Sequence, residues 1–347
     1  MDILEYMSSF RYERLVVATD MGAGLKSIIA IHDTTLGPAC GGVRIWSYRS
    51  EEEAFWDVLR LARAMTYKAA AADLPFGGGK AVILADPHSE KTEALLRAFG
   101  RFVDSLHGLY LTGTDLGSTE RDMEVVRLET SYVAGLPEYG DSAALTGLGV
   151  YRAMKACAQE VWGSDSLVGR TVAIQGFGKV AAGLAHHLLE DGANLVVCDT
   201  HEPSLDLARD LGLRVVPAGD IYGVDCDIFS PCAVGRVINC HTIPRLKCRI
   251  IAGGANDQLL TDAAGDELHR RRILYAPDYI INAGGLILTA AEFGGKLSPE
   301  WALRKTENIY NTMARVIETS KRLNIPTSRA ADLLAEDRLA TVHAAAR

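Results

Sequence analysis

The stretch RTVAIQGFGKVAAGLAHHLLEDGANLVVCDT, residues 170–200, decides the fold class of this 347-residue chain. It begins with a short apolar run typical of a buried strand, turns at a pair of glycines, and continues with the periodic apolar residues of a helix. A second apolar run, NLVVCD at 194–199, predicts a neighbouring parallel strand. This strand–helix–strand unit indicates an α/β domain built on a parallel sheet.

The turn of this unit has the spacing that binds the pyrophosphate of a dinucleotide. Gly176, Gly178 and Ala181 form a G-x-G-x-x-A pattern directly after the strand and at the start of the helix, where backbone N–H groups face an anion. Asp199 ends the next strand, where a carboxylate can bind the ribose hydroxyls. Neither of the two residues after Asp199 is the arginine expected for a 2′-phosphate, so the pattern favours NAD over NADP. The alternative, a packing turn without a ligand, is disfavoured by the paired Asp199.

A second unusual stretch, MTYKAAAADLPFGGGK at residues 65–80, carries two lysines among alanines and glycines. Because Lys68 and Lys80 have few polar neighbours in sequence, each ammonium is expected to be desolvated or held against a bound anion. Three glycines, 77–79, let backbone and ligand approach closely beside Lys80. The alternative is that Lys68 extends into solvent while the glycines only form a turn.

Asp115, in the motif LTGTDLG, is the third candidate for chemistry. A dinucleotide site implies hydride transfer, so the first half of the chain is expected to bind the substrate. Asp115 follows a predicted strand, although an aspartate there can also simply form a turn. Two lysines placed close together repel each other, which favours the neutral amine in one of them. Such a pair provides one base and one ammonium that binds a carboxylate.

The composition is that of an ordinary globular protein and excludes several classes of partner. A net charge of -8 without a basic cluster argues against nucleic acid. The N-terminal residues lack a targeting signal and 18 consecutive apolar residues occur nowhere, so a cytoplasmic protein without membrane contact is expected. Seven cysteines without a CxxC motif are expected to be buried thiols. His186 and His187 are adjacent and point in different directions, so no metal site is expected.

The order of elements predicts an α/β fold with two domains separated by a cleft. We expect an N-terminal mixed-sheet domain for substrate binding and oligomerisation, formed by residues 1–138 and 325–347. Residues 139–324 are expected to form a Rossmann domain that binds NAD. The loop GLPEYGDS, 135–142, has the composition of a hinge.

A long helix is expected to start at Ser50 and to carry Lys68 at its inner end. Its apolar residues recur at helical spacing, and Asp57, Arg60 and Arg63 are expected to face outward.

The chain resembles the amino-acid dehydrogenases of leucine, valine and phenylalanine, which are relatives of glutamate dehydrogenase. The resemblance extends from about residue 15 to about residue 338 and rests on LGPACGGVR, RAMTYKAAAADLPFGGGKAVI, TGTDLG, VAIQGFGKV, DIFSPCAVG and ILYAPDYIINAGG. TGTDLG and AGLP look most similar to phenylalanine dehydrogenases. The resemblance implies reversible oxidative deamination, in which an L-amino acid, NAD and water give the 2-oxo acid, ammonium and NADH. It also implies a homo-oligomer.

By this resemblance, the two lysines and Asp115 have separate roles. Lys80 would be the neutral amine that activates water to attack the iminium, and Asp115 would handle the protons of the amino group. Lys68 would bind the α-carboxylate of the substrate. The groups that would join Lys68 there are Asn282 and the backbone of Gly41 and Gly42.

The resemblance also places residues around the substrate side chain. They are Cys40, Gly113, Leu286 and Thr289. Gly113 leaves room that the alanine of branched-chain enzymes would fill, which favours an aromatic substrate such as L-phenylalanine; a leucine or valine dehydrogenase is the alternative. A catalytically silent relative that only binds nucleotide is a further alternative, which the presence of both lysines and Asp115 disfavours.

The cofactor residues follow from the turn and the resemblance together. They are Gly176, Phe177, Gly178, Lys179, Val180, Asp199, Thr200, Thr146, Cys232, Ala233 and Asn256. Thr146 matches a position that meets the nicotinamide amide, and Asn256 one close to its ribose. The chain departs from the family pattern near this site at Arg236, which replaces a glycine, and at Asp257, which replaces an asparagine.

Overall fold

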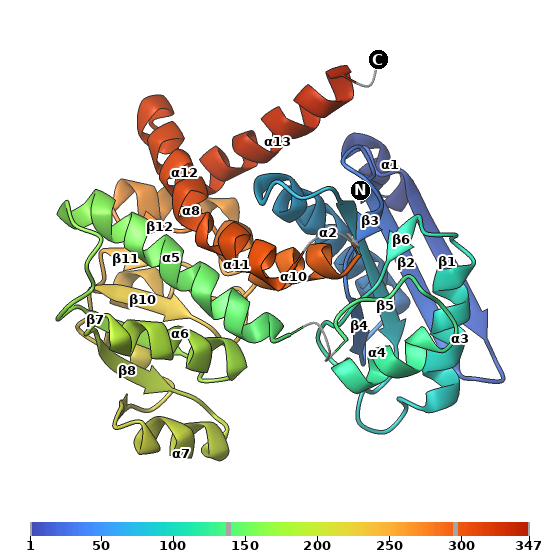
Figure 1. The fold of residues 1–347 in the computed structure, drawn as a ribbon, viewed down its shortest axis with the longest axis horizontal. Coiled ribbons are helices and arrows are strands. Elements are labelled where there is room, and N and C mark those ends of the chain that lie inside the picture. The colour runs from blue at the N-terminus through green and yellow to red at the C-terminus, as the bar shows by residue number, and fades with distance from the viewer. Residues whose placement is uncertain (1, 137–139, 294–297, 346–347) are drawn as a thin grey trace. The chain divides into compact units, whose positions relative to one another are not determined.

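The computed structural model describes residues 2–136, 140–293 and 298–345. The chain divides into two compact units (Figure 1). Unit 1 comprises Met1–Gly140, Thr289–Leu297 and Ala335–Arg347, and unit 2 comprises Asp141–Leu288 and Ser298–Leu334. Both units contain a sheet covered by helices, so the predicted α/β class with two domains is confirmed.

The units divide the chain slightly differently from the boundaries expected from sequence. The first break falls at 140 beside the expected 138, and the last at 334 beside the expected 325. The short segment 289–297, expected in the Rossmann domain, belongs to unit 1. Residues 137–139 of the predicted hinge lie outside the described residues.

Unit 1 is built on a six-stranded mixed sheet. Its strands are β1 (Arg14–Asp20), β2 (Leu25–Asp33), β3 (Ala39–Cys40), β4 (Val43–Trp46), β5 (Gly77–Leu84) and β6 (Tyr110–Leu111). They run in the order β1-β2-β5-β3-β6, with β4 also paired to β5. β5 is antiparallel to β2 and parallel to β3 and β4. Its position in the middle of the sheet buries Lys80, which lies opposite Ala30 of β2.

Helices cover both faces of this sheet. They are α1 (Ile3–Ser9), α2 (Glu51–Ala71), α3 (Glu93–Asp104) and α4 (Glu120–Arg127). The last part of α13 (Thr327–Ala345) contacts the end of α2, where Arg338 donates to the carbonyl of Ala70. Alternate residues of β2 face opposite sides: Ile29 and Ile31 join the core with α3, whereas Ile28 and Ala30 join the core with α2. Lys68 and Lys80 therefore lie on two elements that pack against each other, α2 and β5.

Helix α2 begins where the sequence predicts. Ser50 Oγ accepts the N–H of Glu53 at 3.1 Å, and the helix ends at Ala71, which places Lys68 in its last turn. The side chain of Asp57 does not face solvent as expected: it is 16% exposed and binds arginines of β4 and of its own helix. The guanidinium of Arg63 lies over the ring of Phe10, 4.9 Å from its centroid. The helix side expected to be solvated is thus covered by α1 and β4, which pattern alone does not reveal.

Unit 2 is a doubly wound parallel sheet. Its strands are β7 (Thr171–Gln175), β8 (Asn194–Cys198), β9 (Arg214–Val215), β10 (Ile228–Pro231), β11 (Ile250–Ile251) and β12 (Leu274–Tyr275). The order β12-β11-β10-β7-β8-β9 reverses between β10 and β7, and each of these strands runs parallel to its neighbours. In open sheets of this kind, ligands bind beyond the carboxyl ends of the strands at that reversal.

The helices of unit 2 complete the Rossmann arrangement predicted from residues 170–200. They are α5 (Ser142–Trp162), α6 (Lys179–Glu190), α7 (Glu202–Asp210), α8 (Asp262–Arg270), α9 (Asp278–Ile281), the first part of α10 (Gly284–Phe293), α11 (Pro299–Glu307), α12 (Ile309–Leu323) and the start of α13. Helix α5 packs against both α6 and α12 (Figure 1).

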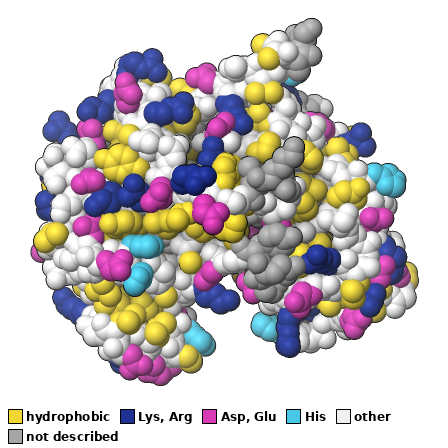
Figure 2. All heavy atoms as spheres, viewed as in Figure 1, with side chains coloured by type: hydrophobic (Ala, Val, Ile, Leu, Met, Phe, Trp, Pro, Cys, Tyr) yellow, Lys and Arg dark blue, Asp and Glu magenta, His cyan; other side chains and the backbone are white. Residues whose placement is uncertain are grey.

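The surface mixes charges of both signs. Figure 2 shows basic and acidic side chains interspersed on this face of each unit. None of the helices in the described chain is long and apolar enough to span a membrane. The seven cysteines are free thiols; five of them are buried as expected, whereas Cys232 is partly buried and Cys240 is exposed.

Candidate functional site

The glycine turn of unit 2 is shaped to admit an anion. Gly176 directly follows β7 with a φ of 90°, and a Cβ there would lie 2.4 Å from the Cβ of Ala233, so only glycine fits. Gly178 is different, because a Cβ at this position would meet nothing within 4 Å. Gly178 is also the N-cap of α6 and has no side chain to cap the helix. The helix N-terminus therefore faces open space of the kind a pyrophosphate needs.

Asp199 closes the turn from the neighbouring strand. One of its carboxylate oxygens, Oδ2, accepts the N–H of Phe177 at 2.6 Å, and Oδ1 accepts those of Thr200 at 2.7 Å and His201 at 2.8 Å. Partial burial alone would raise the pKa of Asp199, but these backbone hydrogen bonds outweigh it and lower the pKa. The turn thus ends at a fixed carboxylate, a group that can accept hydrogen bonds from ribose hydroxyls.

Three loops meet at this edge of the sheet. The loop after β10 supplies Cys232 and Ala233, and the loop after β11 supplies Gly254, whose N–H contacts Cys232 Sγ at 3.4 Å. A Cβ on Gly254 would lie 2.6 Å from Val180 of α6. The candidate cofactor residues therefore gather where the strand order reverses.

Asn282 and Asn256 contact each other beside these loops. Asn282 Nδ2 donates to Asn256 Oδ1 at 2.7 Å and to the carbonyl oxygen of Gly254 at 3.2 Å. Both amide hydrogens of Asn282 are thus engaged within unit 2, whereas its buried Oδ1 has no hydrogen-bond partner among the described residues. Asn282 was expected to join Lys68 at the substrate carboxylate; in this structure its amide hydrogens are bound within unit 2.

Thr146 lies on α5, and its hydroxyl group forms hydrogen bonds within unit 2. Its Oγ1 donates to the carbonyl of Ser142 at 2.8 Å and accepts the N–H of Gly285 at 3.1 Å. These bonds tie the start of α10 to α5 and hold the hydroxyl in one orientation.

The two departures from the family pattern contact each other. Arg236 Nε lies 3.0 Å from Asp257 Oδ2, and the backbone N–H of Arg236 donates to the carbonyl of Asp257 at 2.6 Å. Both residues have a positive φ, 61° and 55°. The pair joins the loop after β10 to the loop that carries Asn256.

In unit 1 the fold brings Lys80 and Asp115 together. Lys80 Nζ lies 2.9 Å from Asp115 Oδ1, and the side chains are 6% and 15% exposed. Lys80 comes from the central strand β5, and Asp115 from the loop after β6. The backbone of Asp115 is held by Ser118, whose Oγ accepts its N–H at 2.8 Å.

Sequence reasoning missed the third member of this group, Arg44 on β4. Its Nε donates to Asp115 Oδ2 at 2.9 Å, and its Nη1 donates to Asp57 Oδ2 at 2.8 Å. Burial alone would raise the pKa of Asp115, but the charges of Lys80 and Arg44 lower it to about 2. The available signal was the surrounding sequence: Arg44 ends LGPACGGVR, an otherwise uncharged stretch in which a buried arginine would need a carboxylate partner.

The glycines beside Lys80 allow other segments of the same chain to pack closely against β5. A Cβ on Gly77 would lie 2.0 Å from the carbonyl oxygen of Asp33, and one on Gly78 would lie 2.0 Å from Thr66 Oγ1. The expectation that a ligand approaches here is thus replaced by close packing of α2 and β2 on β5. Because Thr66 lies two residues before Lys68, this packing fixes the half-buried Lys68 relative to β5.

Gly41 and Gly42 are required by packing of the same kind. A Cβ on Gly41 would lie 1.9 Å from the carbonyl oxygen of Gly79, and one on Gly42 would lie 2.1 Å from that of Thr114. The N–H of Gly41 already donates to the carbonyl of Leu111 at 3.1 Å. The backbone proposed for carboxylate binding therefore lies directly against the strand of Lys80 and the loop of Asp115.

The four residues assigned to the substrate side chain are divided between the units. Cys40 and Gly113 lie in unit 1. Burial raises the pKa of the Cys40 thiol to about 12, so it acts as an apolar wall. A Cβ on Gly113 would meet only the carbonyl of Ala134, at 3.4 Å, so this position has room for a methyl group. Leu286 belongs to unit 2 and Thr289 to unit 1, on the same helix α10.

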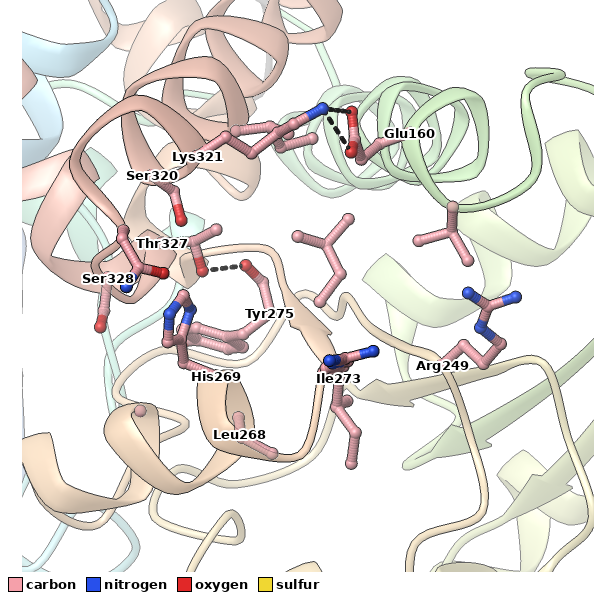
Figure 3. Close-up of a pocket in the computed structure, with 16 residues that line it drawn as sticks. Glu160, Arg249, Leu268, His269, Ile273, Tyr275, Ser320, Lys321, Thr327 and Ser328 are labelled. Atoms are coloured by element: carbon pink, nitrogen blue, oxygen red, sulfur yellow. Dashed lines mark hydrogen bonds and ion pairs between the residues drawn. The ribbon is translucent and has the colours of Figure 1, made fainter.

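A separate pocket of about 480 Å³ lies in unit 2 (Figure 3). It is formed at the amino ends of β11 and β12, where Arg249 and Ile273 line it, and by helices α5, α8, α12 and α13. Arg249 and His269 are exposed, and Lys321 pairs with Glu160 at 2.8 Å (Figure 3). None of the candidate site residues lines this pocket, which is at the opposite ends of the strands from the glycine turn.

Comparisons with known proteins find relatives over nearly the whole chain. The Glu/Leu/Phe/Val dehydrogenase dimerisation domain matches residues 12–132, and the Glutamate/Leucine/Phenylalanine/Valine dehydrogenase domain matches 140–206 and 205–346. The chain is 51% identical to a leucine dehydrogenase of Geobacillus stearothermophilus, over 99% of this chain and 95% of that protein. It is 48% identical to a phenylalanine dehydrogenase of Lysinibacillus sphaericus, over 92% and 87%.

A solved structure shows the same similarity. The crystal structure of L-tryptophan dehydrogenase from Nostoc punctiforme superposes with a TM-score of 0.85 at 44% identity and covers 98% of this chain and 99% of that one. The aromatic preference expected from TGTDLG is not confirmed, because leucine dehydrogenases match with higher identity than phenylalanine dehydrogenases do. The chain belongs to the glutamate/leucine/phenylalanine/valine dehydrogenase family and is an amino-acid dehydrogenase, an oxidoreductase that acts on CH–NH2 donors.

Proposed function

We propose that this protein catalyses the NAD-dependent, reversible oxidative deamination of an L-amino acid to the 2-oxo acid, ammonium and NADH. The observation that carries the proposal is the buried Lys80–Asp115 pair of unit 1, at 2.9 Å, in a chain whose other unit has a glycine turn closed by Asp199. When bound at that turn, NAD supplies the acceptor for the substrate hydride. The carboxylate of Asp199 supports NAD over NADP because it would repel a 2′-phosphate.

The side chains of unit 1 supply the acid–base chemistry. Lys80 is the proposed base for water, and Asp115 holds it from one side. The proposed partner for the α-carboxylate is the half-buried ammonium of Lys68 at the end of α2. Three further side chains are proposed to orient the nicotinamide end of the cofactor and the substrate: Asn256, Asn282 and Thr146. Asn282 donates to Asn256 beside the loops after β10 and β11, and Thr146 accepts the N–H of Gly285 at the start of α10.

For the substrate, we propose branched-chain aliphatic amino acids, with L-leucine first. The support is the identity of 51% over nearly the whole length to a leucine dehydrogenase. An aromatic amino acid is the second candidate, supported by the room beside Gly113, where a Cβ would meet only one atom closer than 3.5 Å. Differences of a few methylene groups are worth only about 1–3 kcal/mol each in an apolar pocket, so related enzymes overlap in substrates.

The direct test is the initial rate of NADH formation with L-Leu, L-Val, L-Phe, L-Tyr and L-Trp, each with NAD and with NADP. We expect the highest kcat/KM with L-Leu and NAD. A clear preference for L-Phe or L-Trp would favour the aromatic assignment. Absence of NADH from every amino acid, with NAD binding intact, would reject the enzyme and leave a nucleotide-binding protein.

The proposed assembly is a homo-oligomer, as the resemblance implies and as the match to a dimerisation domain at residues 12–132 supports. Light scattering of the purified protein measures its mass directly. A mass equal to the single chain of 37.4 kDa would contradict the proposal.

A further inference from the structure

The separate pocket of unit 2 has the size of a small-molecule site (Figure 3). Its volume of about 480 Å³ lies within the range of about 300–1,000 Å³ that is usual for ligand pockets. Every residue that lines it belongs to unit 2, and none of them is a candidate cofactor or substrate residue. The pocket is therefore formed within one compact unit, at the strand edge opposite to the glycine turn.

One wall of the pocket is apolar and buried. Its members are Leu268 of α8, Tyr275 of β12 and Ile317 of α12, which are 1%, 4% and 4% exposed. Two hydrogen bonds hold Tyr275 in place: its hydroxyl accepts the N–H of Asp278 at 3.3 Å, and its carbonyl oxygen accepts the hydroxyl of Thr327. A fixed wall of this kind suits the hydrocarbon or ring part of a ligand.

The polar part of the lining has an excess of positive charge. Arg249, Arg272 and Lys321 line the pocket together with a single carboxylate, Glu160. Lys321 Nζ lies 2.8 Å from Glu160 Oε1, so these two charges cancel. Within the described part of the chain, the side chains of both arginines form no hydrogen bond and no ion pair. Two positive charges thus remain in this pocket, although the net charge of the chain is -8.

Neighbouring carboxylates do not neutralise these two arginines, because other arginines bind them. Asp227, whose carbonyl oxygen accepts the N–H of Arg249 at 3.0 Å, has its carboxylate 3.0 Å from Arg170 Nη1. Glu267, the acidic residue that most closely precedes the second arginine in sequence, binds Arg271 at 3.1 Å. An anion from solution can therefore pair with the arginines of the pocket without breaking an existing ion pair.

Arg272 occupies a backbone position that favours glycine. It directly follows Arg271, the C-cap of α8, with a φ of 57°. A left-handed residue at this point is usually glycine, because a side chain there costs backbone energy. Strained residues of this kind cluster at ligand sites, although a cation near a helix C-terminus is also favourable in itself. The second explanation does not extend to Arg249, which directly precedes β11.

We propose that this pocket binds a small organic anion, in which a carboxylate or phosphate group is attached to an apolar body. The anionic group lies against Arg249 and Arg272, since a guanidinium can bind either kind of group through two parallel hydrogen bonds. The apolar body lies on the buried wall. On the side of the pocket opposite Arg249, His269 lies beside Thr327 and offers a ring N–H to a polar end of the ligand (Figure 3). The inference does not depend on the proposed function.

The test measures the binding of four probes by isothermal titration calorimetry, with and without saturating NAD. Phenyl phosphate and phenylacetate carry an anion on an apolar ring, whereas inorganic phosphate lacks the ring and benzyl alcohol lacks the charge. We expect phenyl phosphate or phenylacetate to bind at least about 10-fold more tightly than both incomplete probes, with the same affinity in the presence of NAD. No advantage of either complete probe over the incomplete ones would overturn the proposal.

Two substitutions locate the bound probe. Arg249→Gln and Arg272→Gln should each weaken its binding at least about 10-fold, because a charged hydrogen-bond donor is lost. Both side chains are exposed, so we expect the variants to fold. Arg214→Gln is the matched control: Arg214 is an exposed arginine on β9 of the same unit, and its variant should keep the parent affinity. Parent affinity in both pocket variants would reject this site.

A further variant separates the pocket from the proposed active site. Lys68 is the proposed partner of a substrate carboxylate in unit 1, so Lys68→Ala should abolish binding of a probe that occupies the active site. Binding in the pocket should persist in this variant. Loss of probe binding in Lys68→Ala, or displacement of the probe by NAD, would contradict the assignment to the pocket. These titrations give the same answer whether or not any amino acid is turned over.

Discussion

The two units build their candidate sites in opposite ways. In unit 2, the glycine turn uses backbone N–H groups and one carboxylate, and all of these lie within residues 176–201. In unit 1, Lys80, Asp115 and Arg44 come from two strands and a loop that span 71 positions of the chain, and their charges are mostly buried. A backbone site therefore follows from local sequence, whereas a site of buried charges exists only after the sheet has formed.

This contrast predicts different consequences of mutation. Changes in unit 1 should alter protonation, turnover and the pH dependence of stability, because its groups are desolvated. Changes in the turn of unit 2 should alter cofactor affinity with little effect on chemistry, because its role is binding.

The largest effect is expected for Lys80→Ala. It removes the proposed base, so kcat should fall by about 1,000-fold or more while the affinity for NAD stays near normal. Steady-state kinetics and NAD titration by fluorescence measure both quantities. Lys91→Ala is the control, since Lys91 forms a similar pair with Asp122 at 2.7 Å in the same unit. Retention of appreciable kcat in Lys80→Ala would refute the assignment of the base.

A smaller effect is expected from His32, which gives unit 1 a buried neutral imidazole. Its Nδ1 lies 2.8 Å from Thr66 Oγ1 and its Nε2 lies 3.1 Å from the carbonyl of Phe10. Burial lowers the pKa of His32 to about 4. Between the ordinary value of about 6.5 and about 4, the unfolded chain binds the proton more readily, so the free energy of unfolding falls as pH falls.

Protonation of His32 alone should lower the free energy of unfolding by at most about 3 kcal/mol between about pH 6.5 and about pH 4. Urea unfolding at neutral pH and near pH 4.5 measures the loss, and His32→Asn should reduce it. His269→Asn is the control because His269 is exposed. An equal loss in the His32 variant and the parent would show that another group controls the acid sensitivity.

The next effect is expected for Asp199→Ala in unit 2. It removes the acceptor of three backbone N–H groups and of the proposed ribose hydroxyls, so KM for NAD should rise about 10- to 100-fold with a small change in kcat. The ratio of kcat/KM with NAD to kcat/KM with NADP should also fall. Asp206→Ala, at an exposed carboxylate on α7, is the control. A loss confined to kcat would contradict a binding role.

The smallest effect is expected for Gly113→Ala. The added methyl group fits, since its nearest neighbour would be the Ala134 carbonyl oxygen at 3.4 Å. We expect the ratio of kcat/KM for L-Phe to that for L-Leu to fall by about 3- to 30-fold, with stability nearly unchanged. Kinetics with both amino acids provide the ratio. Equal losses for the two substrates would show that Gly113 does not shape specificity.

Much of the fold was predictable because its signals are local. The strand, turn and helix of residues 170–200 became β7 and α6, and the capping residue Ser50 started α2 where expected. Asp57 was misplaced, because a helical pattern does not show that α1 and β4 cover that side of α2. The sequence placed segment 289–297 with residues 139–324, whereas the compact units place it in unit 1; α10 runs through this boundary without a local break.

By itself, the sequence determined the α/β class, the glycine turn with Asp199, and the identity of Lys68, Lys80 and Asp115 as candidates. These follow from spacing and from charges in apolar surroundings, which are properties of neighbouring residues. Only the tertiary structure decided that Arg44 binds the second oxygen of Asp115 and that the glycines beside Lys80 pack against protein. Contacts between residues far apart in the chain depend on strand pairing and helix packing, so no local pattern contains them.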